Sequence, residues 1–435
     1  MNSFSFLLLL LRIAQSAPTP NYPLLVYPLQ PTYGATPIIP TDEVAFLLPV
    51  PDLFPSSSTS GARVSTPLVM AYYPDWAGPD FPPEKVDFTR YDWIDFAFAL
   101  PTKDCNLSWD DPDTSPALLA RLVKAAHSQR KKVKLSVGGW TGSQHFSSVV
   151  STDQNRMKFV KNICALYNQF HLDGIDIDWE YPGHQGEGDN EVSPNDTANL
   201  LAFLQLLRRK LPSSAAITAA TLPTPFYGAN GQPLRDVSAF AKVFNWITLM
   251  NYDVWGSSQT PGPNAPLYDA CNNSSQPDGN AVAAFKAWTA AGFPASKLVL
   301  GVPAYGYLSQ SNATRLRTRG SPANVRLVGD GDQIQFRGLL KQGALVRTPA
   351  RDNFGPVFSG GGGFTRYWDK CSSTPFLRSP VGQVVTYDDV QSLGMKAAWT
   401  KQVGMLGVNM FDVHGDTDGS DLADSVRRGL GLIRS

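Results

Sequence analysis

The sequence has no excess of charge of either sign, because 37 Lys and Arg residues stand against 37 Asp and Glu residues. A nucleic-acid or anionic-membrane partner calls for a basic surface, so this balance argues against both. Charged residues make up only 17% of the chain, whereas hydrophobic residues make up 43%, which is enough for a substantial core. These values exclude a disordered chain, a coiled coil and a polytopic membrane protein.

The N-terminus has an apolar run at residues 4–11, which is too short to span a bilayer. Small residues follow at Ala14 and Ser16, the two positions that a signal peptidase reads before a cut at Ala17. No Lys or Arg precedes the run, so a disordered apolar terminus is the alternative. We expect residues 1–16 to be a signal peptide of a secreted, extracellular glycoprotein, which five glycosylation acceptors also favour: Asn106, Asn195, Asn272, Asn273 and Asn312.

Cysteine is scarce, and the four cysteines lack the close spacing of a zinc site. Three lie in loop-like sequence and can pair in an oxidising compartment: Cys105, Cys271 and Cys371. Cys164 lies in an apolar helical pattern and is a candidate for a buried free thiol. Four cysteines allow three connectivities, and the spacing does not choose among them.

Residues 17–66 are rich in Pro, Ser and Thr, and proline blocks regular helix and central strand. We expect a leader or linker there, with one folded domain over residues 67–435. From residue 67 onward, strand-like runs alternate with amphipathic segments such as Ser115–Arg130, Asp153–Phe170 and Asp196–Lys210. Eight such runs predict an α/β fold, a (β/α)8 TIM barrel: Leu68–Tyr73, Trp93–Ala99, Lys132–Val137, Gly174–Trp179, Ala216–Thr221, Trp246–Asn251, Leu298–Val302 and Met405–Phe411.

One interval breaks this alternation, because about 100 residues separate the seventh and eighth runs, far more than an ordinary connection needs. We expect a small α+β subdomain, over about residues 308–385, between strand seven and helix seven. Barrel active sites are built from loops at that end of the strands. The insertion should therefore form one wall of the cleft.

The segment 173–181 carries the strongest chemical signal. In a strand, alternate side chains share a face, so Asp176, Asp178 and Glu180 point one way and the apolar residues between them the other. Carboxyls crowded inside a barrel raise at least one pKa, which suits a general acid. Glu180 comes last, at the catalytic end of the barrel, whereas Asp173 has the opposite parity and is expected to support structure.

Two alternatives for this strand are an exposed acidic edge and a metal site. An edge would not place only apolar side chains on one face and only acids on the other. A metal site would require His or further oxygen ligands, and no His partners the strand in the sequence. We therefore expect catalysis here, without a bound metal.

The motif D-G-I-D-I-D-W-E at 173–180 resembles the D-x-x-D-x-D-x-E signature of family 18 glycoside hydrolases, the chitinases. Three further pieces are similar to family motifs: 135–140 to S-x-G-G on strand three, 250–253 to M-x-Y-D on strand six, and 301–306 to the end of strand seven. The resemblance covers residues 67 to the C-terminus. The sequence, including the segment 368–375, is similar to that of fungal members. It implies a secreted, endo-acting chitinase that hydrolyses β-1,4 linkages between N-acetylglucosamine units.

The resemblance also implies roles for individual residues. Glu180 would protonate the glycosidic oxygen while the substrate's own acetamido carbonyl attacks the anomeric carbon. The product would keep the original configuration at that carbon. Asp178 would orient the acetamido N–H, and Asp176 would share a proton with Asp178. Tyr252 would bond the acetamido oxygen, with Asp253 as a sugar contact. Because the substrate supplies the nucleophile, no cofactor is expected; the partner is chitin or chitooligosaccharides, and the chain is expected to be a monomer.

Further residues are expected around the sugar. Ser136 either hydrogen-bonds Asp176 or is small for packing. The end of strand eight carries Phe411 where family members commonly have a tryptophan, which leaves less stacking area and puts affinity and turnover in question. The remaining substrate-binding candidates lie just after strands or in the motifs above: Trp76, Trp140, Trp255, Met250, Tyr305 and, in addition, Tyr307.

Two rival functions stay open from the sequence. One is cleavage of the chitobiose core of N-glycans by the same chemistry, against which the insertion and the aromatic residues argue. The other is a catalytically silent chitin-binding lectin, which usually lacks the terminal acid of the signature. This chain retains that acid as Glu180.

Overall fold

The computed structural model describes residues 66–256, 261–309, 327, 332–380 and 382–433. The expected signal peptide and residues 17–65 of the expected leader lie outside the described residues, as does Asn312. Within the described part, no helix is long and apolar enough to cross a membrane.

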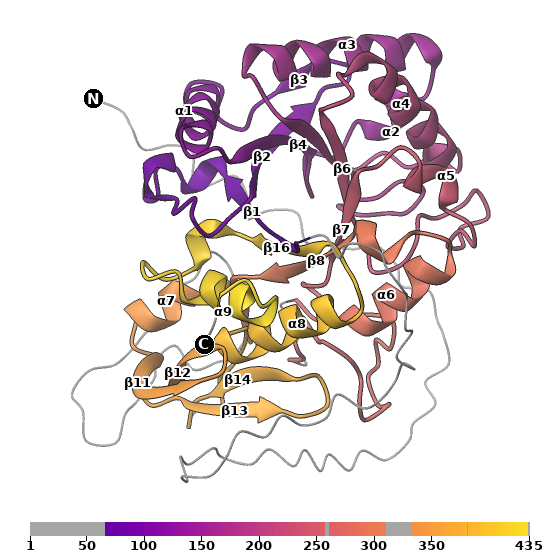
Figure 1. Cartoon of the computed structure of the whole chain (residues 1–435). Coiled ribbons are helices and arrows are strands. Elements are labelled where there is room, and N and C mark those ends of the chain that lie inside the picture. The colour runs from indigo at the N-terminus through magenta and orange to yellow at the C-terminus, as the bar shows by residue number, and fades with distance from the viewer. Residues whose placement is uncertain (1–65, 257–260, 310–326, 328–331, 381, 434–435) are drawn as a thin grey trace, which may run out of the picture. The chain divides into compact units, whose positions relative to one another are not determined.

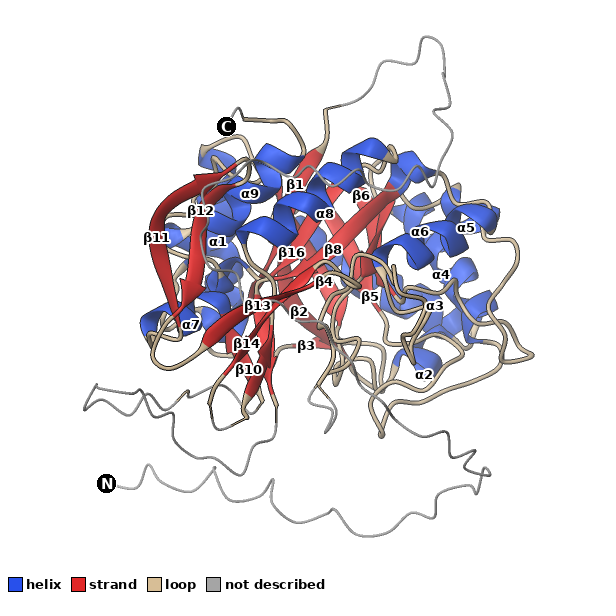
Figure 2. Cartoon of the chain, turned by 90° about the horizontal axis from the view of Figure 1, so that it is seen from below, coloured by secondary structure: helices blue, strands red, loops and turns tan. Residues whose placement is uncertain are grey.

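Eight parallel strands close into a barrel, and helices surround it (Figures 1 and 2). The hydrogen-bonded order is β1-β16-β8-β7-β6-β5-β4-β2, and a further pairing of β1 with β2 closes the ring. The predicted barrel is therefore confirmed, with strand ends that differ from expectation by one or two residues. The strands are β1 Leu68–Pro74, β2 Trp93–Pro101, β4 Lys132–Gly138, β5 Gly174–Asp178, β6 Ala216–Thr221, β7 Trp246–Met250, β8 Leu298–Pro303 and β16 Gly407–Phe411, with the short β3 Leu107–Ser108 antiparallel to the end of β2.

The outer helices bury one apolar stripe against the strands. In α4, the buried residues Leu200, Phe203, Leu204 and Leu207 recur at the spacing of one helix face. The helix α3 begins after Thr152, whose side chain accepts a hydrogen bond from the N–H of Asn155. The helices of the barrel are α1 Ser115–Ser128, α2 Phe146–Val150, α3 Asp153–Gln169, α4 Asp196–Lys210, α5 Ser238–Ala241, α6 Ala281–Ala290, α8 Val390–Gln402 and α9 Asp421–Gly429, with single 3-10 turns at η1 Asp75–Ala77, η2 Pro83–Lys85, η3 Ala295–Lys297 and η4 Val413–Gly415.

The insertion follows β8 directly, which confirms the expected subdomain. It forms a five-stranded sheet in the order β10-β9-β15-β14-β13 and a separate hairpin of β11 and β12. Its first strand begins at Tyr305, slightly before the expected start, because only Ala304 separates it from β8. The elements are β9 Tyr305–Leu308, β10 Gln333–Gln335, α7 Phe336–Lys341, β11 Leu345–Asp352, β12 Gly355–Gly360, β13 Thr365–Asp369, β14 Thr374–Arg378 and β15 Val384–Thr386.

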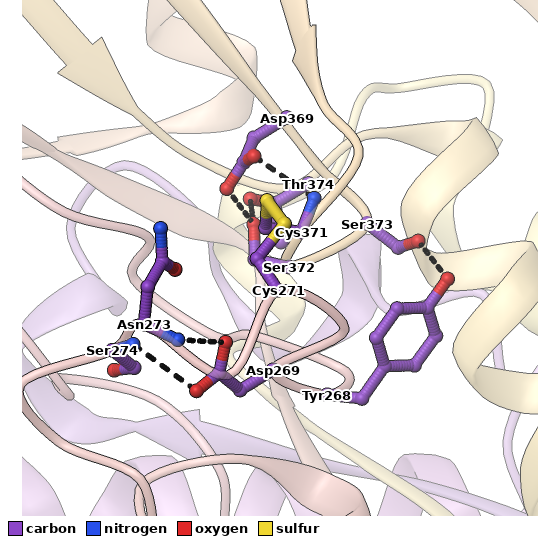
Figure 3. The surroundings of a disulfide bond; sticks show 10 residues. All are labelled: Tyr268, Asp269, Cys271, Asn273, Ser274, Asp369, Cys371, Ser372, Ser373 and Thr374. Carbon is purple, nitrogen blue, oxygen red and sulfur yellow. Dashed lines mark hydrogen bonds between the residues drawn. A yellow bond between two sulfur atoms is a disulfide. The ribbon is translucent and has the colours of Figure 1, made fainter. Parts of the chain in front are cut away.

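A disulfide between Cys271 and Cys371 joins the long segment after β7 to the turn between β13 and β14 (Figure 3). Beside it, the Tyr268 hydroxyl and the Ser373 hydroxyl lie 2.7 Å apart and tie the same two segments. Cys105 is a buried free thiol, and Cys164 is free and half-buried. Of the cysteines in loop-like sequence, Cys105 is therefore the one that stays unpaired.

Candidate active site

The three carboxylates of the signature lie on one face of β5 and of the residue pair after it. Asp176 is completely buried and Asp178 is 4% exposed, whereas Glu180 lies beyond the strand end and is partly exposed. The intervening Ile175 and Ile177 pack in the apolar core under the helices. The alternation predicted from the sequence is therefore present, with Asp176 deepest.

Asp176 is held by three hydroxyl groups from three other strands. The Tyr72 hydroxyl donates to Oδ2 at 3.1 Å and the Ser136 hydroxyl to the same oxygen at 2.9 Å. The Thr218 hydroxyl donates to Oδ1. Ser136 therefore hydrogen-bonds the carboxylate, which was one of its two expected roles. The sequence reasoning missed Tyr72 and Thr218, because neither lies in a motif.

Asp178 is a buried carboxyl surrounded by other acids. Burial raises its pKa well above the usual value, and the nearby carboxylates of Glu180 and Asp176 raise it further. Its Oδ1 atom has no hydrogen-bond partner among the described residues. An unpaired buried acceptor at this position is available to a donor that a ligand brings.

Burial raises the pKa of Glu180 to about 7. A hydrogen bond from Tyr181 opposes this shift, and the negative charge of Asp253 adds to it. A carboxyl with such a pKa holds its proton at mildly acidic pH and can exchange it readily, as a general acid must.

The backbone at the strand end is fixed by the loop that follows β4. The N–H of Gly139 donates to the carbonyl of Asp178 at 2.8 Å. At Gly138, φ is +115°, and a Cβ atom there would lie 2.2 Å from the same carbonyl oxygen. Gly138 is therefore needed for this close approach, whereas a Cβ atom at Gly139 would lie 3.0 Å from the Phe98 ring.

Asn190 secures the other side of the same strand end. Its side-chain amide donates to the carbonyl of Trp140 at 2.9 Å and to that of Glu180 at 3.1 Å. The sequence offered no signal for this residue, because it lies in an irregular polar loop.

The segment after β7 meets the insertion at Asp253. The Tyr305 and Tyr307 hydroxyls both donate to its Oδ1, the latter at 2.8 Å. The Asp253 backbone has a φ of +59°, and its N–H donates to Asn264 Oδ1 at 2.8 Å. Two tyrosines of strand β9 therefore hold the Asp253 carboxylate, so the insertion contacts the segment after β7.

Phe411 joins the aromatic residues around this centre. Its ring centroid lies 5.4 Å from that of Tyr72 and 6.2 Å from those of Tyr252 and Tyr305. Met250, at the end of β7, is buried. Phe411 at the end of β16 thus lies against aromatic rings from β1, from β9 and from the segment after β7.

The three tryptophans do not form one cluster. Trp76 is 54% exposed and lies against Phe98, whereas Trp140 is 51% exposed and meets Tyr181 edge-on. Trp255 is half-buried and packs over Gly262, on its own segment after β7. Large exposed rings at strand ends are suited to stacking on sugar faces.

The structure thus places a row of buried and partly buried carboxyl groups at the end of a barrel strand, and comparison with known proteins gives the family. Residues 68–416 match the family described as glycosyl hydrolases family 18, and the chain belongs to that family. It is 37% identical over 412 residues to a chitinase-like effector of Moniliophthora roreri, with 86% of this chain and 96% of that protein covered. It is 31% identical to chitinase A1 of Niallia circulans, with 71% of this chain and 44% of that protein covered.

Among solved structures, the chain resembles a chitinase from Rhizomucor miehei with a TM-score of 0.67 and 33% identity, with 83% of this chain and 99% of that chain covered. This likeness supports both the barrel and the inserted sheet.

Proposed function

We propose that the chain is a secreted, endo-acting chitinase that hydrolyses β-1,4 linkages between N-acetylglucosamine units with retention of configuration. The observation that carries the proposal is the row Asp176, Asp178 and Glu180 at the barrel mouth, with the pKa of Glu180 raised to about 7 by burial. Its relatives' names support the substrate class. The disulfide and the exposed acceptors Asn106 and Asn195 support an extracellular glycoprotein.

The proposed reaction is the substrate-assisted one that the family resemblance implies, and the placement of the acids supports it. Glu180 gives its proton to the glycosidic oxygen as the bond from that oxygen to the anomeric carbon breaks. The acetamido carbonyl oxygen of the same sugar bonds to the anomeric carbon from the opposite face, which forms an oxazolinium-like cation. Glu180 then takes a proton from water, which attacks the anomeric carbon and reopens the ring with the original configuration.

The other residues hold the acetamido group during these steps. The unpaired Oδ1 of Asp178 accepts the acetamido N–H and stabilises the positive charge that develops. Asp176 shares a proton with Asp178 and buffers its charge. The Tyr252 hydroxyl donates to the acetamido oxygen, and Asp253 contacts the sugar. Phe411 forms an apolar floor, while Trp76, Trp140 and Trp255 stack on neighbouring sugars.

The test is product analysis with an N-acetylglucosamine pentamer. Wild type should release dimer and trimer, and Glu180→Gln should leave the pentamer intact. Glu84→Gln is the matched control, because Glu84 lies on the outer surface in an ion pair with Arg121; it should cleave like wild type. An intact pentamer with folded wild type would contradict the proposal.

A second function, chitin binding without hydrolysis, has two observations in its favour. The relative from Moniliophthora roreri, with 37% identity, is named a chitinase-like effector, and Phe411 offers less stacking area than a tryptophan. In the same assay, an intact pentamer together with retention of the protein on chitin beads would establish this second function.

A further inference from the structure

The barrel interior contains a lysine beneath the signature acids. Lys134 on β4 is fully buried, and its ammonium nitrogen lies 3.1 Å from Asp95 Oδ1 and 3.8 Å from Asp176 Oδ1. The ammonium also donates to the Thr218 hydroxyl at 2.7 Å, and that hydroxyl in turn donates to Asp176. Lysine is almost never fully buried without a partner, because its charge loses hydration.

The fold provides a specific place for this cation. Lys134 is in register with Gly174 on β5, where a Cβ atom would lie 3.0 Å from the lysine Cγ. The rings of Trp93 and Trp246 flank the ammonium, with centroids 5.9 and 4.7 Å from it. Asp95 is in register with Lys134 on the other neighbouring strand. The lysine is thus paired with a carboxylate on each side.

Lys134 is the positive charge among the described residues that face this part of the interior. Asp95 accepts a hydrogen bond from the side-chain amide of Asn409 at 2.8 Å. Its carboxylate therefore contacts one neutral amide and one ammonium. The groups that face Lys134 and the acids, strand by strand, are Tyr72 from β1, Asp95 from β2, Ser136 from β4, Asp176 and Asp178 from β5, Thr218 from β6, Thr248 from β7 and Asn409 from β16, with Glu180 and Tyr252 beyond the strand ends.

We propose that Lys134 is a positioning residue for the glycosidase reaction, whose fixed charge keeps one negative charge on the Asp176–Asp178 pair at mildly acidic pH. This inference rests on the proposed function. A cation within 4 Å favours the ionised form of a carboxyl, and the effect is strong where water is excluded. The pair needs that negative charge, because a doubly protonated pair no longer stabilises the oxazolinium-like cation.

Asp95 provides a control of opposite sign. Burial raises the pKa of Asp95 to about 6, so above this pH its carboxylate draws the lysine charge away from Asp176 and adds a negative charge of its own. Removal of the Lys134 charge should therefore make the pair take up its second proton at higher pH. Removal of the Asp95 charge should have the reverse effect. A purely structural role for the ion pair predicts that neither variant changes the titration of the pair.

The experiment is an infrared titration of the buried carboxyl C=O band without sugar, with Asp178→Asn used to assign the band of the pair. In Lys134→Met the midpoint should rise by about one pH unit or more, and in Asp95→Asn it should fall. The double variant removes the Lys134–Asp95 ion pair without leaving Asp95 as an unpaired buried charge. Lys134 lies between Asp95 and Asp176. The midpoint of the double variant should therefore rise, but by less than the midpoint of Lys134→Met. An unmoved midpoint in the folded variants would overturn the proposal.

A second readout is the acid limb of kcat/KM for the pentamer, which should move in the same directions. If the band moves but wild type does not hydrolyse the pentamer, the proposed function fails while the effect of Lys134 on the pair stands. If wild type hydrolyses the pentamer and neither the band nor the limb moves, the role of Lys134 alone is overturned.

Discussion

The buried hydroxyl of Ser143 accepts a hydrogen bond from the backbone N–H of Glu180, with 2.9 Å between the two heavy atoms. The same hydroxyl faces the carbonyl oxygens of Gly139 at 2.8 Å and Asp178 at 3.1 Å and shares its proton between them. The Ser143 side chain therefore joins the C-terminal end of β5 to the loop after β4.

Removal of this hydroxyl should loosen the position of the general acid. We expect Ser143→Ala to lower kcat about tenfold with a smaller change in KM, because a catalytic group displaced by a fraction of an ångström loses reactive geometry. The control is Ser128→Ala, at an exposed serine at the end of α1 whose hydroxyl bonds only a local carbonyl. Steady-state kinetics with an unchanged kcat would contradict this role.

The pH dependence of hydrolysis should show the raised pKa of Glu180. The acid form is the active one, so the rate should fall as pH rises, with the midpoint of the basic limb near 7. Measurement of kcat/KM against pH decides this. A basic limb near 4.5, the ordinary value for a glutamic acid, would show that burial does not tune the group.

The same shift has a consequence for stability. Because the folded protein holds the Glu180 proton more tightly than the unfolded chain, stability should be lost as pH rises from about 4.5 to about 7. Glu180→Gln removes this loss. Its Tm, measured by calorimetry, should therefore exceed that of wild type more at pH 8 than at pH 4; an equal difference at both pH values would contradict the assignment.

If Phe411 forms the proposed floor of the sugar site, its ring size should limit affinity. Phe411→Trp should lower KM for the pentamer about two- to tenfold, because a larger ring adds stacking contact with the sugar. Phe411→Ala should raise KM. If neither substitution changes KM or pentamer binding, Phe411 does not contact the sugar.

The disulfide should stabilise the attachment of the insertion. It closes a loop of 100 residues, so Cys271→Ser combined with Cys371→Ser should lower the free energy of unfolding by about 2–4 kcal/mol. Cys164→Ser, at the half-buried free thiol, is the control and should change stability less. Thermal unfolding with and without reductant is the measurement, and a reductant should lower the Tm of wild type but not that of the double variant.

The strands and the acids of the site could be predicted because their signals are local. Alternation within β5 places Asp176, Asp178 and Glu180 on one face whatever surrounds them. The partners of Asp176 could not be predicted in the same way. Tyr72 and Thr218 are separated from it by 104 and 42 residues, and only closure of the barrel brings them together.

Other features depend on contacts that no local pattern specifies. Lys134 looks in the sequence like an ordinary charge at the start of a strand, and only its register with Asp95 and Gly174 shows that it is buried. The pairing of Cys271 with Cys371 likewise follows from the return of the insertion to the segment after β7.

The central claim is that the substrate's acetamido group displaces the leaving sugar while Glu180 protonates the glycosidic oxygen. Proton NMR of the first product released from the N-acetylglucosamine pentamer tests this most directly, with the fully deacetylated pentamer as a matched substrate. The account predicts a β-anomer as the first product and no cleavage of the deacetylated pentamer. An α-anomer as the first product, or cleavage of the deacetylated pentamer at a comparable rate, would contradict it.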